Sequence, residues 1–468
     1  MICNVCHVTK PESEFTKVNR SKDGTKGLCK ECKSKRDAEY YERLQKRNAK
    51  LEFFELTTDL LTKRKRARIG VLNLVKFTDR EQTKNIASVD MTNFGLNAIL
   101  KELDEPYEYC NARTVNDYEF ILISLTSSMD VENLIYTFEA FAPSEVKAKV
   151  IVGGFGVINI NLIKTYIDIA CFGRCEGQIN DILADKRLSN VWRKEDDPEL
   201  TGEYEIRQAQ YLVDGECAIG CRHQCGFCQY TYTRRPMKPN QLYRHGKSTS
   251  AIESEWAALE VSKAGSYTTA WDGWSDETRR KVLKPVTDSS IRRKLIEIGT
   301  NKDIDGGINL KVFQIVGYPW ETKESVLEDI YNTNKLLREI DSNIYNNITL
   351  VFYNTPFSPE PLTPMQYDAS NIYINWRDVL NFKYVYNGKR LKGIISPMIS
   401  GSYTLMKRTF INRATVGHAE MFKRVVFNSM LGRMNDKRKM DWLLKHGAID
   451  ERLFGEIDSL PYRLTAPR

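Results

Sequence analysis

The stretch Glu216-Cys217-Ala218-Ile219-Gly220-Cys221-Arg222-His223-Gln224-Cys225-Gly226-Phe227-Cys228 decides how the rest of this chain is interpreted. Cys221, Cys225 and Cys228 follow a C-x3-C-x2-C spacing, and an aromatic residue, Phe227, stands directly before the last cysteine. Closely spaced thiolates are soft ligands that suit an iron–sulfur cluster. Three of them leave one iron of a [4Fe-4S] cube without a protein thiolate, so that iron can take an outside ligand.

Two other sites fit these cysteines less well. Zinc normally takes four ligands in paired sets, and Cys217 or His223 could complete such a set. A disulfide loop suits secreted proteins, whereas the N-terminus Met-Ile-Cys-Asn shows no signal peptide. A cluster frame that began at Cys217 would need a cysteine at 224, where Gln224 stands. Cys217 is therefore expected beside the cluster and not among its ligands.

The spacing and the Phe227-Cys228 ending resemble the cluster loop of radical S-adenosylmethionine (SAM) enzymes. This resemblance implies that Cys221, Cys225 and Cys228 hold a [4Fe-4S] cluster and that SAM binds the open iron. It also implies that an electron from an external donor, passed through the cluster, splits SAM. The resulting 5′-deoxyadenosyl radical would abstract a hydrogen atom from the substrate.

Length and composition indicate a multidomain globular protein. The 468 residues correspond to about three domains, and 41% of them are hydrophobic. No apolar run approaches the roughly 20 residues that a membrane helix needs. We therefore expect a cytoplasmic protein, in the host cytoplasm if it is phage-encoded. Eleven cysteines in such a chain point to metal or redox chemistry more than to a disulfide framework.

The excess positive charge is confined to the first 68 residues. They hold 18 Lys and Arg against 10 Asp and Glu, a difference of +8, which equals the net charge of the whole chain. Such an asymmetry indicates a local anionic partner and favours nucleic acid.

The same N-terminal segment contains two C-x2-C pairs, which predict a zinc site held by Cys3, Cys6, Cys29 and Cys32. The stretches Lys10-Pro11-Glu12-Ser13-Glu14-Phe15 and Cys29-Lys30-Glu31-Cys32 resemble the small zinc modules at the start of many phage and mobile-element nucleases. This resemblance implies nucleic-acid targeting. A zinc-stapled module that binds a protein partner remains the alternative.

The next segment alternates short apolar runs with helical spans, which predicts a Rossmann-like domain with a parallel sheet. The order Ser124-Leu125-Thr126, then Gly153-Gly154, resembles the cobalamin-binding domain that precedes many radical SAM cores. The resemblance implies that Ser124, Thr126, Gly153 and Gly154 contact cobalamin.

The closing segment of that domain departs from the family pattern. Residues 167–177 resemble its Gly-x-Gly-Glu ending, but Cys175 replaces the usual glycine. No histidine lies between positions 8 and 222, so the Asp-x-His-x-x-Gly loop that supplies a cobalt ligand in some relatives is absent. Either cobalamin binds without a protein histidine or the domain has lost it, and a purely structural α/β domain is a third reading.

Two later stretches resemble parts of the radical SAM core, a partial (β/α) TIM-like barrel. They are Ala270 to Glu277 and Lys311 to Thr322, the second of which resembles the Gly-x-Pro-x-Glu-Thr strand end of that family. The resemblance implies that Trp271, Asp272, Gly273 and Ser275 line the SAM pocket and that Gly317 and Pro319 shape its adenosine end. From about residue 396 the chain has helical spacing and many Lys and Arg residues, for which a surface helical bundle is favoured over a cap that contacts substrate.

Together these patterns predict an α/β protein with four regions: a zinc module (1–67), a cobalamin-binding-type domain (68–200), a radical SAM core (201–395) and a helical region (396–468). The predicted activity is modification of a nucleic-acid base, with DNA favoured, by hydrogen abstraction with methyl transfer or rearrangement. One alternative is a radical SAM enzyme for a small molecule or peptide. Another is a non-enzymatic nucleic-acid-binding protein with two zinc sites.

Overall fold

The structure is a computed structural model, and it divides the chain into two compact units, Met1–Arg66 and Ala67–Arg468. The residues that it describes are 2–3, 26–27, 31, 35, 67–74, 94–213, 219–221, 223–235, 261, 265–304, 306–340, 348–368, 371, 374, 376, 383–386, 389–395, 402–430, 438, 441, 445 and 463–465.

In the first unit, β1 (Ile2–Cys3) pairs in parallel with β2 (Lys26–Gly27). Of the predicted zinc ligands, Cys6, Cys29 and Cys32 lie outside the described residues, and Cys3 is described only by its backbone in β1. The zinc site stays a prediction.

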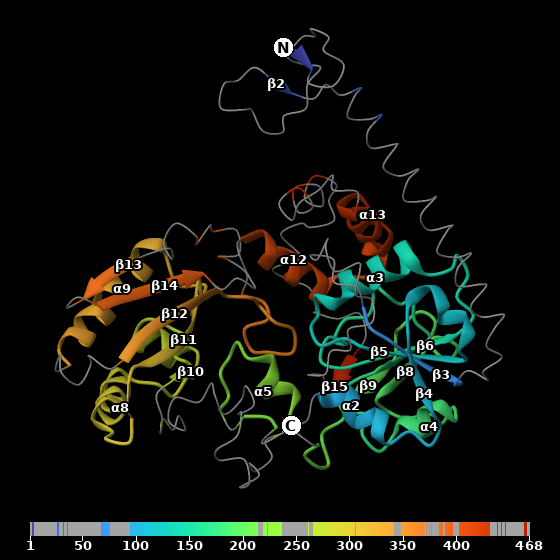
Figure 1. Ribbon diagram of the computed structural model, residues 1–468, viewed down its shortest axis with the longest axis horizontal. Helices are drawn as coiled ribbons and strands as arrows, with labels where there is room; N and C mark the ends of the chain where they lie inside the picture. Colours follow the sequence, from blue (N-terminus) through green and yellow to red (C-terminus); the bar gives the residue numbers. More distant parts are fainter. Residues whose placement is uncertain are drawn as a thin grey trace. The chain divides into compact units, whose positions relative to one another are not determined.

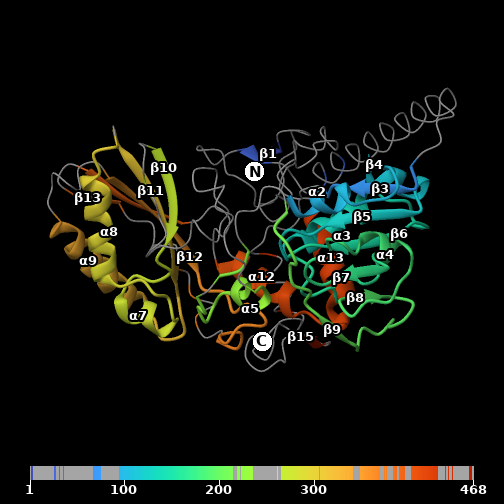
Figure 2. The ribbon, with the colours of Figure 1, turned by 90° about the horizontal axis from the view of Figure 1, so that it is seen from below.

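The second unit contains a six-stranded sheet (Figure 1), and Figure 2 shows its strands in the order β4-β3-β5-β6-β7-β8. The strands are β3 (Ile69–Leu72), β4 (Tyr107–Cys110), β5 (Phe120–Ser124), β6 (Lys149–Gly153), β7 (Ile169–Cys171) and β8 (Val191–Arg193). All neighbours pair in parallel except β7 and β8. The five parallel strands therefore have the doubly wound order 2-1-3-4-5, whose ligands bind beyond the carboxyl ends of the strands.

This first sheet is covered on both faces, as a parallel sheet requires. Along β5, Ile121 and Ile123 enter one apolar core, while Phe120 and Leu122 enter a second core on the opposite face. The helices of this half are α2 (Phe94–Lys101), η3 (Ala112–Asp117), α3 (Asp130–Phe141) and α4 (Ile179–Leu183). The alternation explains why the strands appear in the sequence as continuous apolar runs.

A second sheet has the order β10-β11-β12-β14-β13. Its strands are β10 (Gly265–Ala270), β11 (Ile308–Val316), β12 (Ile348–Pro356), β13 (Lys383–Tyr386) and β14 (Lys389–Ile395), and only β13 is antiparallel. Its helices are α7 (Asp276–Lys281), α8 (Asp288–Thr300) and α9 (Lys323–Arg338). Strand-then-helix units of this kind agree with the predicted mixed α/β class, and the barrel itself stays a prediction.

Burial in the second sheet alternates along the strand, unlike burial in the first. In β11 the residues from Ile308 to Val316 alternate between buried and more exposed positions. The buried ones pack with α8 and α9, which lie together on one face of the sheet (Figure 2). Phe313 on the other face is 40% exposed and contacts the ring of Tyr353 on β12.

The C-terminal helices belong to the core of the first half, which differs from the surface bundle expected from the sequence. Phe410 of α12 (Ser402–Arg413) and Phe422 of α13 (Ala419–Met430) are fully buried against the α3 side of the first sheet. The basic residues of this segment had suggested a surface position. Lys407, however, is buried and forms an ion pair of 2.8 Å with Glu132 of α3. Near the C-terminus, β15 (Arg463–Thr465) pairs with β9 (Glu203–Glu205). No helix in the described ranges has the length and apolar character needed to cross a bilayer.

Candidate functional site

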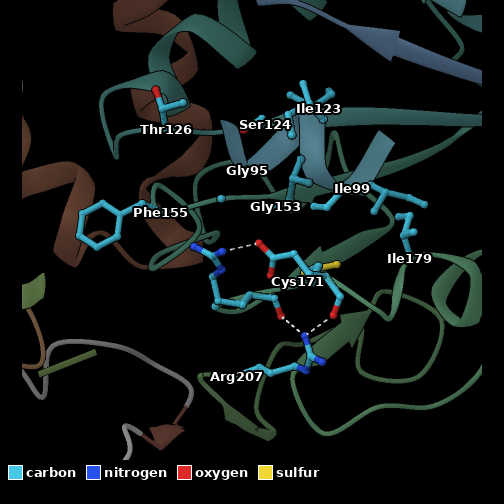
Figure 3. Close-up of a pocket in the computed structure, with 18 of the residues that line it drawn as sticks. Gly95, Ile99, Ile123, Ser124, Thr126, Gly153, Phe155, Cys171, Ile179 and Arg207 are labelled. Atoms are coloured by element: carbon cyan, nitrogen blue, oxygen red, sulfur yellow. Dashed lines mark hydrogen bonds and ion pairs between the residues drawn. The ribbon is translucent and has the colours of Figure 1, made fainter. Parts of the chain in front are cut away.

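A cavity of about 280 Å³ lies at the carboxyl ends of β5, β6 and β7 (Figure 3). The register places Ser124 of β5 opposite Gly153 of β6, and the next strand ends at Cys171. A Cβ atom on Gly153 would lie 4.0 Å from the Cβ of Cys171, so these strand ends form one row. The predicted cobalamin residues Ser124, Thr126, Gly153 and Gly154 all line this cavity.

Gly154 allows the β6 loop to approach the loop that follows β5. Its φ is +102°, and a Cβ at this position would lie 2.5 Å from the carbonyl oxygen of Leu125. Two backbone hydrogen bonds join the loops: Leu125 N–H donates to Gly153 at 2.8 Å, and Gly156 N–H donates to Leu125 at 2.7 Å. The glycine is therefore needed for the shape of the cavity floor, whether or not a ligand contacts it.

Thr126 has a local partner. Its backbone N–H and its hydroxyl donate to Asp130 Oδ2 at 2.8 and 2.9 Å. Asp130 begins α3, so this carboxylate also complements the helix N-terminus. The contacts fix the loop after β5 at the edge of the cavity.

The charged residues on the cavity wall are largely paired with the protein itself. Arg174 and Glu176 form an ion pair of 2.8 Å, with both side chains mostly buried. Arg207 Nη1 donates to the carbonyl oxygens of Arg174 at 3.1 Å and Glu176 at 2.7 Å, as Figure 3 shows. These bonds tie the segment after β7 to the segment that follows β9.

Two cysteines that the sequence left among scattered thiols also line the cavity. Cys171 ends β7 and Cys175 follows four residues later, with exposed fractions of 2% and 5%. The neighbouring thiol of Cys171, together with burial, raises the pKa of Cys175 well above its usual range. The signal that could have identified them was the C-x3-C spacing at the end of a predicted strand.

The predicted cluster loop packs against the part of the chain that surrounds the second sheet. Gly226 N–H donates to Val282 O at 2.9 Å, Met365 N–H donates to Gly226 O at 3.2 Å, and the thiol of Cys225 lies 3.8 Å from Leu283 O. Phe227 packs beside Tyr318, with ring centroids 6.2 Å apart. These hydrogen bonds and the ring contact therefore hold the loop against the segments around the second sheet.

The charges of the three loop thiols affect one another. Burial raises the pKa of Cys225 to about 12, and the charges of Cys228 and Cys221 add to the increase, whereas nearby Lys284 opposes it. Burial also raises the pKa of Cys228. Among the residues described, no three His, Cys, Asp or Glu side chains converge on a position for a single metal ion. In a cluster, by contrast, each thiolate binds a different iron.

A buried ion pair adjoins these thiols. Lys284 Nζ lies 2.6 Å from Asp272 Oδ2, and the side chains are only 9% and 12% exposed. Asp272 has a φ of +59°, a backbone conformation that costs free energy in a non-glycine residue, and its carbonyl oxygen accepts a hydrogen bond of 2.8 Å from the Tyr318 hydroxyl. Among the predicted SAM residues, Asp272 is the one whose charge acts on the loop, because it raises the pKa of both Cys225 and Cys228.

A short helix connects the cluster loop to the cavity. α5 (Gln229–Thr233) starts directly after Cys228, and its Tyr230 hydroxyl accepts a hydrogen bond of 3.0 Å from Gly220 N–H beside Cys221. Arg234 follows the helix and lies 4.5 Å from the ring centroids of both Tyr230 and Phe155. Because Phe155 and Arg234 both line the cavity, the two candidate sites share this contact.

The other predicted SAM residues serve local structure. Trp271 is fully buried against Phe352. Ser275 accepts a hydrogen bond from Thr278 N–H as the N-cap of α7. Gly273 and Gly317 have close packing neighbours, because an added Cβ would lie 2.9 Å from Thr278 and 2.6 Å from Trp376, respectively.

The turn that contains Pro319 is closed by a buried carboxylate. Glu321 Oε2 accepts hydrogen bonds from Gly317 N–H at 2.7 Å and Tyr318 N–H at 3.1 Å, while its other oxygen accepts from the Thr278 hydroxyl at 3.2 Å. Burial raises the pKa of Glu321 to about 7. The Gly-x-Pro-x-Glu-Thr pattern thus has a sufficient structural explanation.

Comparison with known proteins gives no family assignment. No family model matches this chain, and no curated protein matches it. Among solved structures, the chain is similar to the cobalamin-dependent S-adenosylmethionine radical enzyme OxsB with aqua-cobalamin bound, with 11% identity, a TM-score of 0.41 and coverage of 82% of this chain and 76% of that chain. OxsB with aqua-cobalamin and S-adenosylmethionine bound gives 10% identity, a TM-score of 0.40 and coverage of 85% and 77%. Likeness at this level does not carry residue roles from one chain to another.

Proposed function

We propose that this chain is a radical SAM enzyme with a corrinoid-binding cavity and that it modifies a base in nucleic acid, with DNA favoured over RNA. The observation that carries the proposal is the C-x3-C-x2-C loop, in which Cys225 is buried, the charges of Cys221 and Cys228 act on it, and the backbone of Gly226 is hydrogen-bonded to Val282 and Met365.

Cys221, Cys225 and Cys228 would hold the cluster. Their surroundings fit such a group, because burial disfavours free thiolates and the bound irons would take the place of the protons. When bound, the cluster and SAM supply a carbon-centred radical that removes hydrogen from an unactivated C–H bond. The protein positions these groups, and the Lys284–Asp272 pair places one cation and one carboxylate beside the loop.

Ser124, Gly153 and Gly154 would lie against a corrinoid in the cavity. Glycines and apolar side chains such as Ile99, Ile151 and Ile179 line the cavity, a lining that would suit the apolar faces of a corrinoid ring. No histidine is present among the lining residues, so this group would bind without imidazole. A bound corrinoid would make methyl transfer the favoured outcome over rearrangement.

The nucleic-acid substrate is supported by the sequence alone. The first 68 residues carry the whole net charge of +8, which suits phosphate contacts. A base in a duplex would have to leave the stack to reach a buried centre, so single-stranded or flipped bases are the expected substrates.

The proposal is tested by anaerobic reconstitution with iron, sulfide, SAM and a reductant, with and without cobalamin. We expect 5′-deoxyadenosine, and a mass change in DNA or RNA oligonucleotides screened by mass spectrometry. Cys225→Ala should abolish both, whereas Cys110→Ala, which replaces a free cysteine outside the loop and the cavity, should abolish neither. If the reconstituted protein binds no iron or forms no 5′-deoxyadenosine, the radical SAM proposal is wrong.

A further inference from the structure

The face of the second sheet that is turned away from α8 and α9 carries a pair of aromatic rings. Phe313 of β11 and Tyr353 of β12 are register partners, and their ring centroids lie 5.7 Å apart with an angle of 54° between the planes. Phe313 is 40% exposed and Tyr353 is partly buried, whereas their neighbours on either side in both strands are buried. Two adjacent rings that reach solvent, in strands that otherwise bury their apolar residues, form a candidate contact surface.

This aromatic pair lies close to the proposed cluster loop. Ile315 follows Phe313 on the same face of β11, about 7 Å further along the strand. Ile315 packs against the same small apolar cluster as Phe227, which directly precedes the last cysteine of the loop. The carbonyl oxygen of Phe313 also accepts a hydrogen bond of 3.3 Å from the N–H of Asp272, whose carboxylate belongs to the ion pair beside the loop. A ligand on the two rings would therefore lie near the place where the radical is expected to form.

The charges around the aromatic pair suit an anionic ligand. The strands β10, β11 and β12 contain no acidic residue on either face. Lys311 precedes Phe313 on the same face and is exposed. The register sets one row across four strands next to the rings, and this row consists of Thr268, Lys311, Val351 and Lys392. A lysine beside accessible rings can contact a phosphate while the neighbouring base stacks on a ring.

We propose that this face is a stacking platform for a base of the substrate, in which the base lies against Phe313 and Tyr353 and a neighbouring phosphate contacts Lys311. This inference rests on the nucleic-acid part of the proposed function and adds the place where the base is held. A flat base can lie parallel to only one of two rings inclined at 54°, so the other ring would contact its edge. Every base has a π face, so the platform itself would accept any base.

The first test measures how a fluorescein-labelled single-stranded DNA of about 16 nucleotides binds the full chain, by fluorescence anisotropy. Raised salt weakens the phosphate contacts expected from the first 68 residues, so stacking then makes a larger share of the binding. Phe313→Leu and Tyr353→Leu keep an apolar side chain but remove a ring, and each should weaken binding about tenfold, as the loss of a stacked base does. Tyr331→Leu is the matched control, because it removes a ring that is 67% exposed on α9, and it should leave binding unchanged.

The second test locates the base on wild type. The same DNA with 5-iodouracil, which couples under irradiation to an aromatic side chain stacked on it, is crosslinked to the protein, and the peptide is identified by mass spectrometry. We expect the crosslink at Phe313 or Tyr353. DNA that crosslinks only outside β11 and β12, or that binds equally to wild type and both ring variants, overturns the platform and leaves the nucleic-acid substrate standing. Wild type that binds neither this DNA nor the matching RNA overturns both. The crosslink is measured on wild type, so the conclusion does not depend on the folding of the variants.

Discussion

The two sheets differ in whether the residues at the carboxyl ends of their strands border a cavity or are hydrogen-bonded to other parts of the protein. At the first sheet, Ser124, Gly153 and Cys171 form a row that borders a cavity. At the second, Ser275 caps a helix, and the backbone N–H groups of Gly317 and Tyr318 are bonded to a buried carboxylate. Motif residues of similar type can therefore border a cavity in one sheet and close a turn in the other.

The largest expected effect concerns the cavity floor. Gly154→Val should lower the free energy of unfolding by about 4 kcal/mol, because left-handed strain and the clash with Leu125 O add together. Gly177→Val is the matched control: its φ is +74°, but no atom lies within 4 Å of an added Cβ. There we expect about 1 to 2 kcal/mol from strain alone. Equal losses in urea denaturation would show that the Gly154 loop can move away.

The next effect concerns the ion pair beside the cluster loop. Lys284→Met should cost about 3 to 4 kcal/mol, because it leaves the mostly buried Asp272 carboxylate without its partner. Adding Asp272→Asn should recover most of the loss in urea denaturation. Lys281→Met, which breaks an exposed pair with Glu277, is the control and should cost less than about 1 kcal/mol. If the double variant is no more stable than Lys284→Met, the pair is not the cause.

Much of the first sheet could be predicted from the sequence, because its strands are buried on both faces. Continuous apolar runs such as Phe120–Ser124 and Lys149–Gly153 are typical of strands covered on both faces. Ser124, Thr126, Gly153 and Gly154 were proposed from a family resemblance, and they line one cavity because strand ends in a parallel sheet meet at one edge. Cys171 and Cys175 were not predicted together as cavity residues, because the position of Cys175 depends on the path of the loop after β7.

The second sheet was harder to interpret, because the same motif residues could either contact a ligand or close a turn. The Gly-x-Pro-x-Glu-Thr pattern correctly marked the end of β11, yet it could not reveal that Glu321 bonds the turn internally. In the tail, the basic residues suggested a surface, whereas the apolar stripe of Phe422, Val425 and Val426 enters the core. A local sequence pattern does not show which residues pair across the fold, as Lys407 does with Glu132.

The Glu321 turn gives a pH-dependent prediction. Burial raises the pKa of Glu321 from its ordinary value of 4.5 to about 7 in the folded chain, so folding favours the protonated form. The associated stability is present below the unfolded pKa and is lost as pH rises toward 7, by about 3 kcal/mol in total. Glu321→Gln stays neutral, so the difference in unfolding free energy between wild type and variant should move by that amount between pH 4.5 and 7. A difference that is constant with pH would contradict the raised pKa.

The smallest effect separates a helix cap from a SAM contact at Ser275. As the N-cap of α7, Ser275 accepts a hydrogen bond of 3.2 Å from Thr278 N–H, so Ser275→Ala should cost about 1 kcal/mol and Ser275→Thr should restore it. If the cap is its only role, the affinity for SAM, measured by equilibrium dialysis with reconstituted protein, should change by less than about twofold in both variants. A large loss of SAM affinity in Ser275→Ala with unchanged stability would instead place the hydroxyl in the SAM site. The second sheet would then resemble the first in presenting motif side chains to a ligand.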